Sequence, residues 1–402
     1  MMQTFYSLLM LTMLLLTACS GPQQANPTKE AASLETPPAP AQAPAPVSAL
    51  VPAAVQVPAR YQSAYPGGDR KLQLPPGFTI QVFAAGLQGP RHMAIGPDGA
   101  VYVAEMSANR VSRLADADGD GVADSSEIYA SNMERAHGVE WHQGALYVGA
   151  IDGIYRFDGK GVRGEKLVDL PASGSHITRT VRFGQDGRMY VTIGSTCNVC
   201  KEEDAHRAAM WVYNADGSGG RLFARGLRNT VDFAFHPQTG AIFGADNGRD
   251  SLGDDLPPEE LNLIRDGGDY GWPVCHGGQI SDPQFGQPDS CSTTVAPALK
   301  MQAHSAPLGV QFYSGTQFPA AYQGRLFITF HGSWNRSERT GYKVVSVPFQ
   351  NGEPSGQPED FLTGWLTGSG AWGRPVGVLR TPDGALLISD DQGGVIYRVS
   401  YQ

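Results

Sequence analysis

The sequence predicts an all-β fold, a six-bladed β-propeller, and two observations carry this prediction. Amphipathic patterns of helix length are almost absent from the chain. A glycine-containing turn followed by a six-residue apolar strand occurs six times, as AVYVAE after Gly99, ALYVGA after Gly144, RMYVTI after Gly187, AIFGAD after Gly240, RLFITF after Gly324 and ALLISD after Gly384. The spacings of these turns, 45, 43, 53, 84 and 60 residues, indicate one repeated unit of about four strands with insertions in the later copies.

Further apolar strands flank the quoted strand in each copy. One precedes the turn, at residues 91–98, 137–143, 178–186, 231–238, 308–313 and 376–383, and another often follows, at residues 109–114, 152–157, 208–214, 260–266, 342–349 and 393–399. Strand repeats of about 40–50 residues are typical of propeller blades, and six of them close a ring around a central channel. An open β-solenoid or a pair of β-sandwiches is the alternative, but no copy is atypical enough to be a cap.

The N-terminal residues 1–18 are expected to be a lipoprotein signal peptide. The apolar run of residues 8–16 is shorter than the roughly 20 residues that span a bilayer, so it is typical of a signal-peptide core and not of an anchor helix. Leu16-Thr17-Ala18-Cys19 resembles the lipobox of bacterial lipoproteins, which predicts lipidation of Cys19. The expected location is the periplasmic side of the cell envelope, and the resemblance to bacterial lipoproteins, with Ser20 and not Asp after the Cys, implies the outer membrane. No Lys or Arg precedes the run, and ordinary signal-peptidase cleavage nearby stays an alternative.

Residues 19–65 are expected to be a disordered linker, since Pro, Ala and Gln dominate them and PPAPAQAPAP lies at their centre. Such a segment has too few periodic apolar residues to offset the entropy of ordering it. The folded propeller domain is therefore expected at residues 66–402.

Four of the five cysteines form two close pairs, which predicts the disulfides Cys197–Cys200 and Cys275–Cys291 in an oxidising compartment. For the first pair, half of a zinc site or a haem attachment is the alternative. A second C-x-x-C is missing, however, and Lys201 stands where haem attachment needs His. The net charge of −9 argues against nucleic acid as a partner, because a phosphate-binding surface needs a basic excess.

Residues 116–127, DADGDGVADSSE, have the spacing of an EF-hand calcium loop. This spacing predicts a structural calcium ion held by the side chains of Asp116, Asp118, Asp120, Asp124 and Glu127 and by the Val122 carbonyl. The flanking stretches are short and strand-like, so a calcium sensor with a helix on each side is not expected. A solvated acidic loop without metal stays the alternative.

Basic side chains stand directly before the first strand of each copy, where the loops of a propeller converge on the channel mouth. They are Arg91 and His92, Arg135 and His137, His176, Arg228 with Asn229, His304, and Arg374. We therefore expect a cationic, histidine-containing funnel that concentrates an anionic ligand. Arg side chains can hold carboxylates there by bidentate hydrogen bonds, and a His can act as a base near neutral pH.

Several long motifs between residues 72 and 400 resemble one family. SGSHITRTVRFGQDGRMYVTIGS, GLRNTVDFAFHPQTGAIFGADNG, DDLPPEELNLIRDGGDYGWP, QAHSAPLGVQFY, HGSWNRSERTGYKVVSVPF and WGRPVGV are similar, in this order, to the six-bladed soluble quinoprotein sugar dehydrogenases, above all to their sorbosone and pyranose dehydrogenase branch. The resemblance implies the cofactor pyrroloquinoline quinone (PQQ) and calcium. It also implies a sugar or a related polyol or aldehyde as substrate, of the aldose, pyranose or sorbosone type, and a periplasmic electron acceptor.

The resemblance further implies the roles of individual residues. His176 aligns with the base that takes the proton of the sugar hydroxyl while a hydride moves to the quinone, and Arg228 aligns with the residue that polarises the quinone carbonyl. The other expected cofactor contacts are Asn229, Arg374, Trp334, Arg336 and, at the channel mouth, His137. The cofactor calcium is expected on the backbone carbonyls of Gly248 and Arg249.

Two departures from the family pattern affect the expected site. Ser175 stands where glucose-oxidising members have an acidic residue, and the loop from Cys197 replaces a shorter one, which reshapes the substrate side of the mouth. Two other functions stay open: a calcium-dependent propeller lactonase and a non-catalytic lipoprotein that binds a partner or a glycan. A lactonase centre would draw on acidic residues, and the run Asp246, Asp250, Asp254 and Asp255 is expected on a solvated rim or bonded to backbone.

Overall fold

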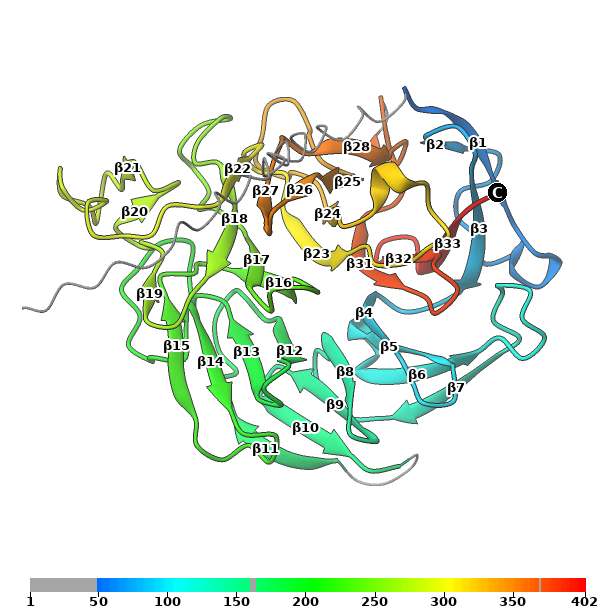
Figure 1. Ribbon diagram of the computed structural model, residues 1–402, viewed down its shortest axis with the longest axis horizontal. Coiled ribbons are helices and arrows are strands. Elements are labelled where there is room, and N and C mark those ends of the chain that lie inside the picture. The colour runs from blue at the N-terminus through cyan, green and yellow to red at the C-terminus, as the bar shows by residue number, and fades with distance from the viewer. Residues whose placement is uncertain (1–48, 160–163, 369) are drawn as a thin grey trace, which may run out of the picture. The chain divides into compact units, whose positions relative to one another are not determined.

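The computed structural model describes residues 49–159, 164–368 and 370–402. Six sheets follow one another in chain order around a central channel and form the blades of a β-propeller (Figure 1). The only helices in the described residues are three short 3₁₀ helices, η1 (Ala59–Tyr61), η2 (Met106–Ala108) and η3 (Ala320–Tyr322). The predicted fold class is confirmed.

Each blade is a sheet whose first strand lies innermost. Blade 1 contains β4 (Pro90–Ile95), β5 (Val101–Glu105), β6 (Arg110–Ala115) and β7 (Ser125–Ala130), and blade 2 contains β8 (Gly138–His142), β9 (Ala145–Ala150), β10 (Gly153–Phe157) and β11 (Glu165–Asp169). Blade 3 contains β12 (Arg179–Phe183), β13 (Met189–Ile193), β14 (Ala209–Tyr213) and β15 (Arg221–Arg225), with β19 (Gly268–Asp269) added at its edge. Blade 4 contains β16 (Thr230–Phe235), β17 (Ile242–Asp246), β18 (Glu259–Ile264) and β22 (Leu299–Met301).

The last two blades and three short pairs complete the strand inventory. Blade 5 contains β23 (Pro307–Phe312), β24 (Leu326–Phe330), β25 (Lys343–Val347) and β28 (Glu359–Leu362), and blade 6 contains β31 (Pro375–Arg380), β32 (Leu386–Asp390), β33 (Val395–Tyr401), β3 (Phe78–Ala85), β1 (Val51–Gln56) and β2 (Lys71–Leu74). The two-stranded pairs are β20 (Cys275–His276) with β21 (Ile280–Ser281), β26 (Phe349–Gln350) with β27 (Glu353–Pro354), and β29 (Leu366–Thr367) with β30 (Gly370–Ala371).

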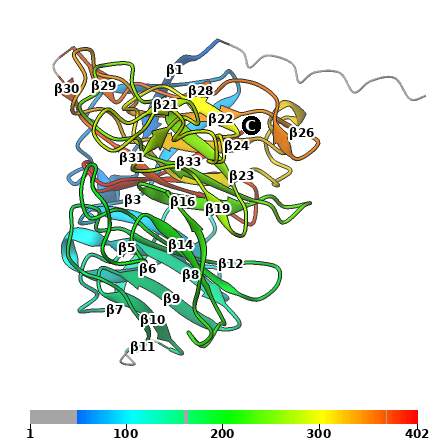
Figure 2. The same cartoon turned by 90° about the vertical axis from the view of Figure 1, so that its left-hand side faces the viewer.

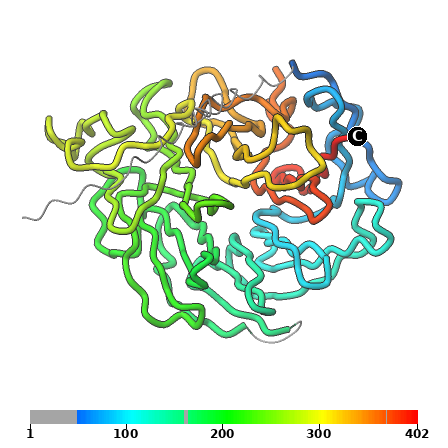
Figure 3. Tube along the Cα trace, in the orientation of Figure 1, coloured from blue at the N-terminus to red at the C-terminus, as the bar shows by residue number. Residues whose placement is uncertain are grey.

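Closure of the ring joins the two ends of the folded chain. β33 pairs antiparallel with β3, with Phe78 opposite Tyr401 and Ala85 opposite Val395. The blue and red ends of the trace accordingly lie side by side in Figure 3. The inner strands also contact one another around the ring, from β4 through β8, β12, β16 and β23 to β31 and back to β4. This closed ring excludes the open solenoid.

The six strands that revealed the repeat are the second strands of the blades, and every residue in them is buried. Each has a strand on both sides within its own blade, as β9 has in Figure 2, and neighbouring blades cover both of its faces. Apolar side chains are therefore needed on both faces, which explains the continuous apolar runs. The glycines of the six preceding turns all have positive φ, between 70° and 94°, a conformation that glycine adopts without a steric penalty.

Glycines in the inner strands allow the blades to approach closely at the channel. A Cβ atom on Gly138 would lie 2.7 Å from the Arg179 carbonyl oxygen, and one on Gly377 would lie 2.7 Å from the Arg91 carbonyl oxygen. Both contacts are to the backbone of the inner strand in the next blade. A side chain at either position would force two blades apart.

The folded part begins before residue 66, which corrects the predicted end of the linker. β1 pairs antiparallel with β2 and parallel with β3, so it extends the sixth sheet. Arg60 then forms an ion pair of 2.5 Å with Asp124 of the first blade. Composition did not reveal β1, because VPAAVQ lacks a strict apolar alternation and its pairing partners lie at residues 71–74 and 80–81.

The predicted signal peptide, the predicted lipidation site Cys19 and the predicted linker up to residue 48 lie outside the described residues. Within the described ranges, no helix combines the length and the apolar character needed to cross a bilayer.

Candidate active site

A cavity of ≈ 210 Å³ opens where the loops leading into the inner strands of blades 3, 4 and 5 meet. Its lining also includes residues from the loops after β17 and β24 and from the start of β18. The lining residues are His176, Arg228, Asn229, Asn247, Gly248, Asp250, Glu259, His304, Ala306, Trp334 and Asn335. Carboxylates and amides thus stand beside the predicted basic groups His176, Arg228 and His304.

The hydrogen bonds of His176 place its ring proton on Nδ1. This atom lies 2.9 Å from both the carbonyl oxygen and Oγ of Ser195. A carbonyl oxygen can only accept, and Ser195 Oγ donates its own proton to the Cys197 carbonyl at 2.7 Å. Both partners therefore accept from Nδ1–H, and Nε2 is the unprotonated nitrogen that a general base needs.

His176 is also held neutral and fixed in place. Burial, and next the guanidinium of Arg228, lower the pKa of His176 to about 3, so the imidazole is uncharged at neutral pH. Its backbone carbonyl accepts from Nη1 of Arg179 at 3.1 Å and from Nη1 of Arg207 at 3.3 Å. Both arginines are buried, so the loop that carries the base is fastened from two sides.

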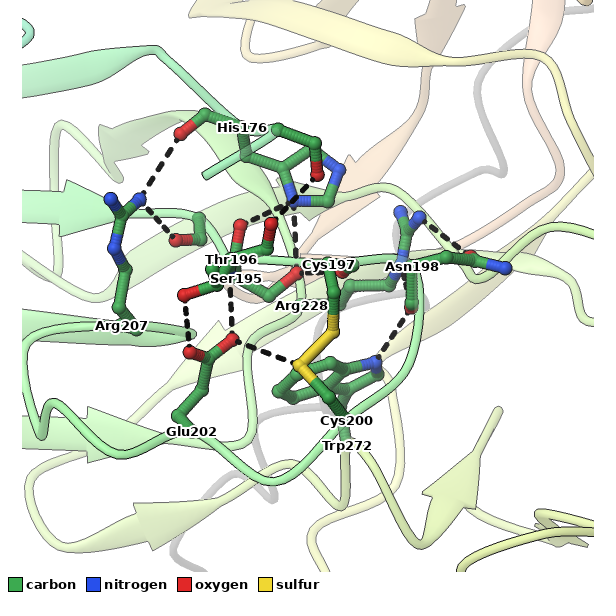
Figure 4. The surroundings of a disulfide bond; sticks show 12 residues. His176, Ser195, Thr196, Cys197, Asn198, Cys200, Glu202, Arg207, Arg228 and Trp272 are labelled. Carbon is green, nitrogen blue, oxygen red and sulfur yellow. Dashed lines mark hydrogen bonds between the residues drawn. A yellow bond between two sulfur atoms is a disulfide. The ribbon is translucent and has the colours of Figure 1, made fainter. Parts of the chain in front are cut away.

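Arg228 is buried and its guanidinium is anchored by four hydrogen bonds; Figure 4 shows its contact with Asn198. Nε donates to the Asn198 carbonyl at 2.9 Å, Nη1 to the Asn247 carbonyl at 3.0 Å, and Nη2 to Asn198 Oδ1 at 3.0 Å and to an Asp250 carboxylate oxygen at 3.3 Å. Burial lowers the pKa of Arg228, but a guanidinium stays protonated over the physiological range. The cavity therefore contains a fixed positive charge.

Gly194 brings His176 and Asn229 together. A Cβ atom on Gly194 would lie 2.5 Å from Asn229 Oδ1 and 2.7 Å from His176 Cβ, so only glycine fits between them. Asn229 Oδ1 is buried and has no hydrogen-bond partner within the described residues. A buried acceptor without a partner is unfavourable, and it suits a cation or an N–H group of a ligand.

Two buried carboxylates fasten the loops that line the cavity. Asp246 accepts from the Asn229 N–H at 3.2 Å, and Glu259 accepts from the N–H groups of Gly248 at 2.6 Å and Ala306 at 2.9 Å. Burial raises the pKa of Asp246 to about 7 and that of Glu259 to about 8. Asp246, a member of the predicted acidic run, thus accepts a hydrogen bond from the backbone, which was one of the two expectations for that run. Glu259 was not predicted from the sequence.

A signal for such carboxylates was present in the repeat itself. Three of the six strand motifs end in an acid, namely Glu105, Asp246 and Asp390. Glu105 accepts from the Gln88 N–H at 2.7 Å, and Asp390 accepts from the Arg374 N–H at 2.8 Å. In each case a buried acid at the end of the second strand ties down the loop that leads into the inner strand of the same blade.

The rim of the cavity is a hydrogen-bonded group around Asp250. Asn335 Nδ2 donates to Asp250 Oδ1 at 2.6 Å and lies 3.2 Å from His304 Nδ1. His304 Nε2 donates to the Gly253 carbonyl at 2.8 Å, so Nδ1 is an acceptor for the Asn335 amide. Trp334, at 76% exposure, stands on this rim with most of its ring in solvent.

His137 is not among the residues that line the cavity, and its contact with a cofactor stays a prediction. The side chain is fully buried, Nδ1 lies 3.2 Å from Thr180 Oγ1, and the ring packs 4.2 Å from the ring of His92. A side chain that directly precedes an inner strand can thus point into the wall of the channel and not only into its mouth.

Arg374 and Arg336 are likewise absent from the lining residues, although both were predicted to bind the cofactor. Arg374 donates to the carbonyls of His331 and Gly332 at 3.1 and 2.9 Å. Arg336 forms an ion pair of 2.9 Å with Asp255. Both guanidinium groups fasten loops around the cavity.

Of the two predicted carbonyl ligands for calcium, Gly248 belongs to the cavity lining and Arg249 does not. The Arg249 side chain is buried, and its Nη1 donates to Asp282 Oδ2 at 2.5 Å. His276 Nε2 lies 2.9 Å from the same carboxylate oxygen. This cluster holds the loop after β17 against the insertion that contains β20 and β21.

Both predicted disulfides are confirmed. Cys197 and Cys200 are joined with a Cα–Cα distance of 6.2 Å, and Cys275 and Cys291 with a Cα–Cα distance of 5.3 Å. Bonded sulfurs leave no thiolate for zinc or for haem attachment, which excludes the alternative for the first pair.

The predicted calcium loop is formed only in part. Carboxylate oxygens of Asp116, Asp118 and Asp120 gather within 4.8 Å of one another. Asp124, in contrast, uses its carboxylate for Arg60 and for the Ala117 N–H, and Glu127 lies in β7 at 3.3 Å from Arg113. The three gathered carboxylates accept N–H groups of the loop itself, whereas Asp124 and Glu127 are engaged by arginines from outside it.

The donor set of the cavity fits the cofactor and metal implied by the sequence resemblance. An anchored guanidinium suits an anionic, carbonyl-bearing group, and the neutral imidazole next to it suits proton transfer. The unpartnered Asn229 Oδ1 and the carboxylate of Asp250 suit a hard cation such as calcium.

Comparison with family models and known sequences identifies a family and several relatives of this chain. A family model described as TrAA12-like matches residues 72–402. An uncharacterised protein of Borreliella burgdorferi is 30% identical over 355 residues, which cover 82% of this chain and 91% of that protein.

A pyrroloquinoline quinone-dependent pyranose dehydrogenase of Coprinopsis cinerea is 25% identical over 402 residues. The match covers 81% of this chain and 54% of that protein, so the chain spans about half the length of this relative. Among solved structures, a Trichoderma reesei protein of Carbohydrate-Active Enzymes Family AA12 has TM-scores of 0.75 as an iodide structure and 0.74 as a calcium structure, with 23% identity over 84% of this chain and 98% of that one. This structural likeness concerns the fold.

Proposed function

The chain belongs to the TrAA12-like family, and from this membership we propose that it is a PQQ-dependent dehydrogenase of sugars or related polyols, with its active site in the cavity around His176 and Arg228. Relatives named as PQQ-dependent pyranose and sugar dehydrogenases support the reaction class. The structural observation that supports it is a neutral histidine and an anchored arginine lining one cavity.

His176 is the proposed general base. Its Nε2 lone pair takes the proton from the substrate hydroxyl that is oxidised, while Nδ1–H stays bonded to Ser195. Because the pKa of His176 is lowered to about 3, no proton has to leave the ring before the reaction begins. A positioned base contributes about 10²–10⁴-fold in rate.

Arg228 is the proposed electrostatic catalyst. When bound, PQQ would supply the acceptor for the hydride that leaves the substrate carbon. The Arg228 guanidinium stabilises negative charge that develops at an acceptor oxygen, and its four existing hydrogen bonds mean that it does not have to reorganise. One such donor is worth about 3–4 kcal/mol of barrier.

The proposed holder of the cofactor calcium is the segment after β17. The Gly248 and Arg249 carbonyls are its proposed backbone ligands, and Asn229, which lines the cavity, has an unpartnered acceptor in Oδ1. The proposed substrates are aldose, pyranose or sorbosone-type compounds. Next to the base, Ser175 Oγ donates to the Thr196 carbonyl at 3.0 Å, so a neutral hydroxyl stands where glucose-oxidising members of the family have a carboxylate.

The test is reconstitution of purified apoprotein with PQQ and calcium, followed by a panel of sugars and an artificial electron acceptor. We expect one quinone per chain and reduction of the dye with at least one sugar. The variant His176→Ala should bind the quinone and lose about 10²–10⁴-fold in kcat. His206→Ala is a matched control, because the His206 ring stacks on Trp211 outside the cavity. Failure of the wild-type protein to bind PQQ, or full activity of the His176 variant, would contradict the proposal.

A calcium-dependent lactonase is the second candidate, because Asp250, Glu259 and Asn247 contribute oxygen-bearing groups to the cavity. It predicts hydrolysis of lactones with calcium and without PQQ. A protein that neither binds quinone nor hydrolyses lactones would favour the third candidate, a non-catalytic binding lipoprotein.

We further propose that a lipid on Cys19 anchors the chain at the periplasmic side of the cell envelope, where a periplasmic acceptor takes the electrons. Labelled fatty acid should be incorporated into the wild-type chain, and Cys19→Ala should abolish the label and release the protein from the membrane fraction. A wild-type protein that carries no label would favour ordinary signal-peptidase cleavage.

A further inference from the structure

The Cys197–Cys200 loop contacts Arg228 directly and is linked to His176 through Ser195 (Figure 4). We propose that this loop is a positioning element: Asn198 positions Arg228, and Cys197 positions His176 through Ser195. The inference rests on the proposed function and names residues that the sequence resemblance does not include. Its basis is the set of hydrogen bonds made by two consecutive residues of the loop, Cys197 and Asn198.

Asn198 uses both ends of its side chain and its carbonyl oxygen. Oδ1 accepts from Arg228 Nη2 at 3.0 Å and from the Asp250 N–H at 2.8 Å, while Nδ2 donates to the Asp250 carbonyl at 3.3 Å. The carbonyl oxygen accepts from Arg228 Nε at 2.9 Å and from Trp272 Nε1 at 3.3 Å. Two donors face Oδ1 and an acceptor faces Nδ2, so the amide has one satisfied orientation. Asn198 thus ties Arg228 to the segment after β17.

Cys197 acts on the other catalytic residue. Its carbonyl accepts the hydroxyl proton of Ser195 at 2.7 Å, which leaves Ser195 Oγ as an acceptor for His176 Nδ1. If this carbonyl moved away, the Ser195 hydroxyl could turn and donate to His176 Nδ1. The ring would then carry its proton on Nε2 and could not accept one there. The tautomer of His176 is therefore set by two groups: the Ser195 carbonyl, which can only accept from Nδ1, and the Cys197 carbonyl, which keeps the Ser195 hydroxyl from donating to Nδ1.

The disulfide keeps these two carbonyls in place. The Cys197 carbonyl serves Ser195 and the neighbouring Asn198 carbonyl serves Arg228, so the backbone must hold one conformation across the loop. On the side away from the cavity, the Glu202 carboxylate accepts from the Thr196 N–H at 2.6 Å and from Thr196 Oγ1 at 2.5 Å. The segment is thus fixed by a covalent bond at one point and by a carboxylate at another.

Loop length distinguishes positioning from general stabilisation. A disulfide stabilises a fold mainly by restricting the unfolded chain, and this effect grows with the length of the closed loop. The separation is 3 residues for Cys197–Cys200 and 16 residues for Cys275–Cys291. Removing the Cys275–Cys291 disulfide should therefore lower the melting temperature more. Removing the Cys197–Cys200 disulfide should affect the cavity more.

The first experiment compares the double variants Cys197→Ser/Cys200→Ser and Cys275→Ser/Cys291→Ser as apoproteins. Nitrogen-15 spectra of labelled histidine, with His176 assigned by its Ala variant, report which ring nitrogen carries the proton. We expect Nδ1–H in the wild-type protein and in the Cys275 variant, and a mixture of tautomers in the Cys197 variant. An unchanged His176 spectrum in the Cys197 variant would overturn the proposal for Cys197, and so would an equal change in both variants.

The second experiment tests Asn198 on the reconstituted protein. Asn198→Ala removes the side-chain bonds to Arg228 and Asp250, and we expect the dissociation constant of PQQ to rise, and kcat to fall, at least about tenfold, with the KM for sugar within about twofold. Asn214→Ala is the matched control, since Asn214 bonds Ser218 in an exposed turn. Unchanged kcat and PQQ affinity in Asn198→Ala would overturn its role. If the wild-type protein does not bind PQQ, the proposed function fails, while the histidine spectra of the apoprotein still test the role of Cys197.

Discussion

Nδ1 of His176 and the carbonyl oxygen of Ser195 are 2.9 Å apart, and this bond makes Nε2 the proton acceptor in the cavity. It joins the loop before β12 to the residues just after β13, so the ring is oriented by the blade that carries it. The hydrogen bond made by the other ring nitrogen usually sets the tautomer of a functional histidine.

His176 should stay neutral across the physiological pH range. Burial and then Arg228 lower its pKa to about 3, so nuclear magnetic resonance of the apoprotein should show no titration of His176 between pH 5 and pH 8. Arg228→Met removes the nearby positive charge and should raise the pKa of His176. Titration of the wild-type ring near pH 6.5, the value for an exposed histidine, would contradict this prediction.

Gly194→Ala should impair the cavity with little change in the fold. The added Cβ atom would lie 2.5 Å from Asn229 Oδ1 and 2.7 Å from His176 Cβ, so one of these residues has to move. We expect a loss of stability of about 1–3 kcal/mol from overpacking, and a fall in PQQ affinity or kcat of at least about tenfold. Gly368→Ala is the control, because its Cβ atom would meet nothing within 4 Å. Equal effects of the two substitutions would argue against the close approach.

Asp390→Asn should change the pH dependence of stability. Burial raises the pKa of Asp390 to about 6, compared with about 3.9 in an unfolded chain. Between these values the folded protein keeps a proton that the unfolded chain has released, so this carboxyl makes the free energy of unfolding fall as the pH rises from about 4 to about 6. An Asn side chain keeps the acceptor for the N–H groups of Arg374 and Gly393 and has no charge to bury.

Urea unfolding of the apoprotein at several pH values measures this effect. The variant should match the wild-type protein near pH 4 and should exceed it by about 1–3 kcal/mol at pH 7–8. A difference between variant and wild type that is the same at both pH values would contradict the assignment to Asp390.

Calcium should stabilise the first blade through Asp116, Asp118 and Asp120. A ligand that binds only the folded state raises the melting temperature in proportion to the logarithm of its concentration. We expect a rise of several degrees with millimolar calcium in the wild-type protein and a smaller rise in Asp118→Ala, which keeps only the proposed cofactor calcium site. Asp124→Asn should keep the rise, because Asp124 is engaged by Arg60 and the Ala117 N–H. Loss of the calcium effect in the Asp124 variant would instead support the full loop of residues 116–127.

Much of the fold could be predicted because its signals are local. A glycine turn with positive φ and a fully buried second strand recur in every blade, and both leave a pattern within about ten residues. β1 could not be predicted in this way, since its pairing with β2 and β3 gives it a partner on each side but leaves its own side chains largely exposed.

Some residues of the site were predicted and others were not, again because only local signals can be recognised in the sequence. His176, Arg228, Asn229, Gly248 and Trp334 line one cavity, as the motifs indicated. Asn198 was not predicted, because its role depends on three hydrogen-bonding groups that come from other loops.

The sequence by itself determined the number and order of the blades, the two disulfides and the positions at which functional side chains enter the channel. Only the tertiary structure decided which of those side chains reach the cavity. Long guanidinium and imidazole groups can turn to any partner within several ångströms, and the partners are brought near by the packing of other blades and insertions. Arg374 turns to the carbonyls of His331 and Gly332, and His137 turns to Thr180 and His92, whereas Arg228 is held at the cavity by Asn198.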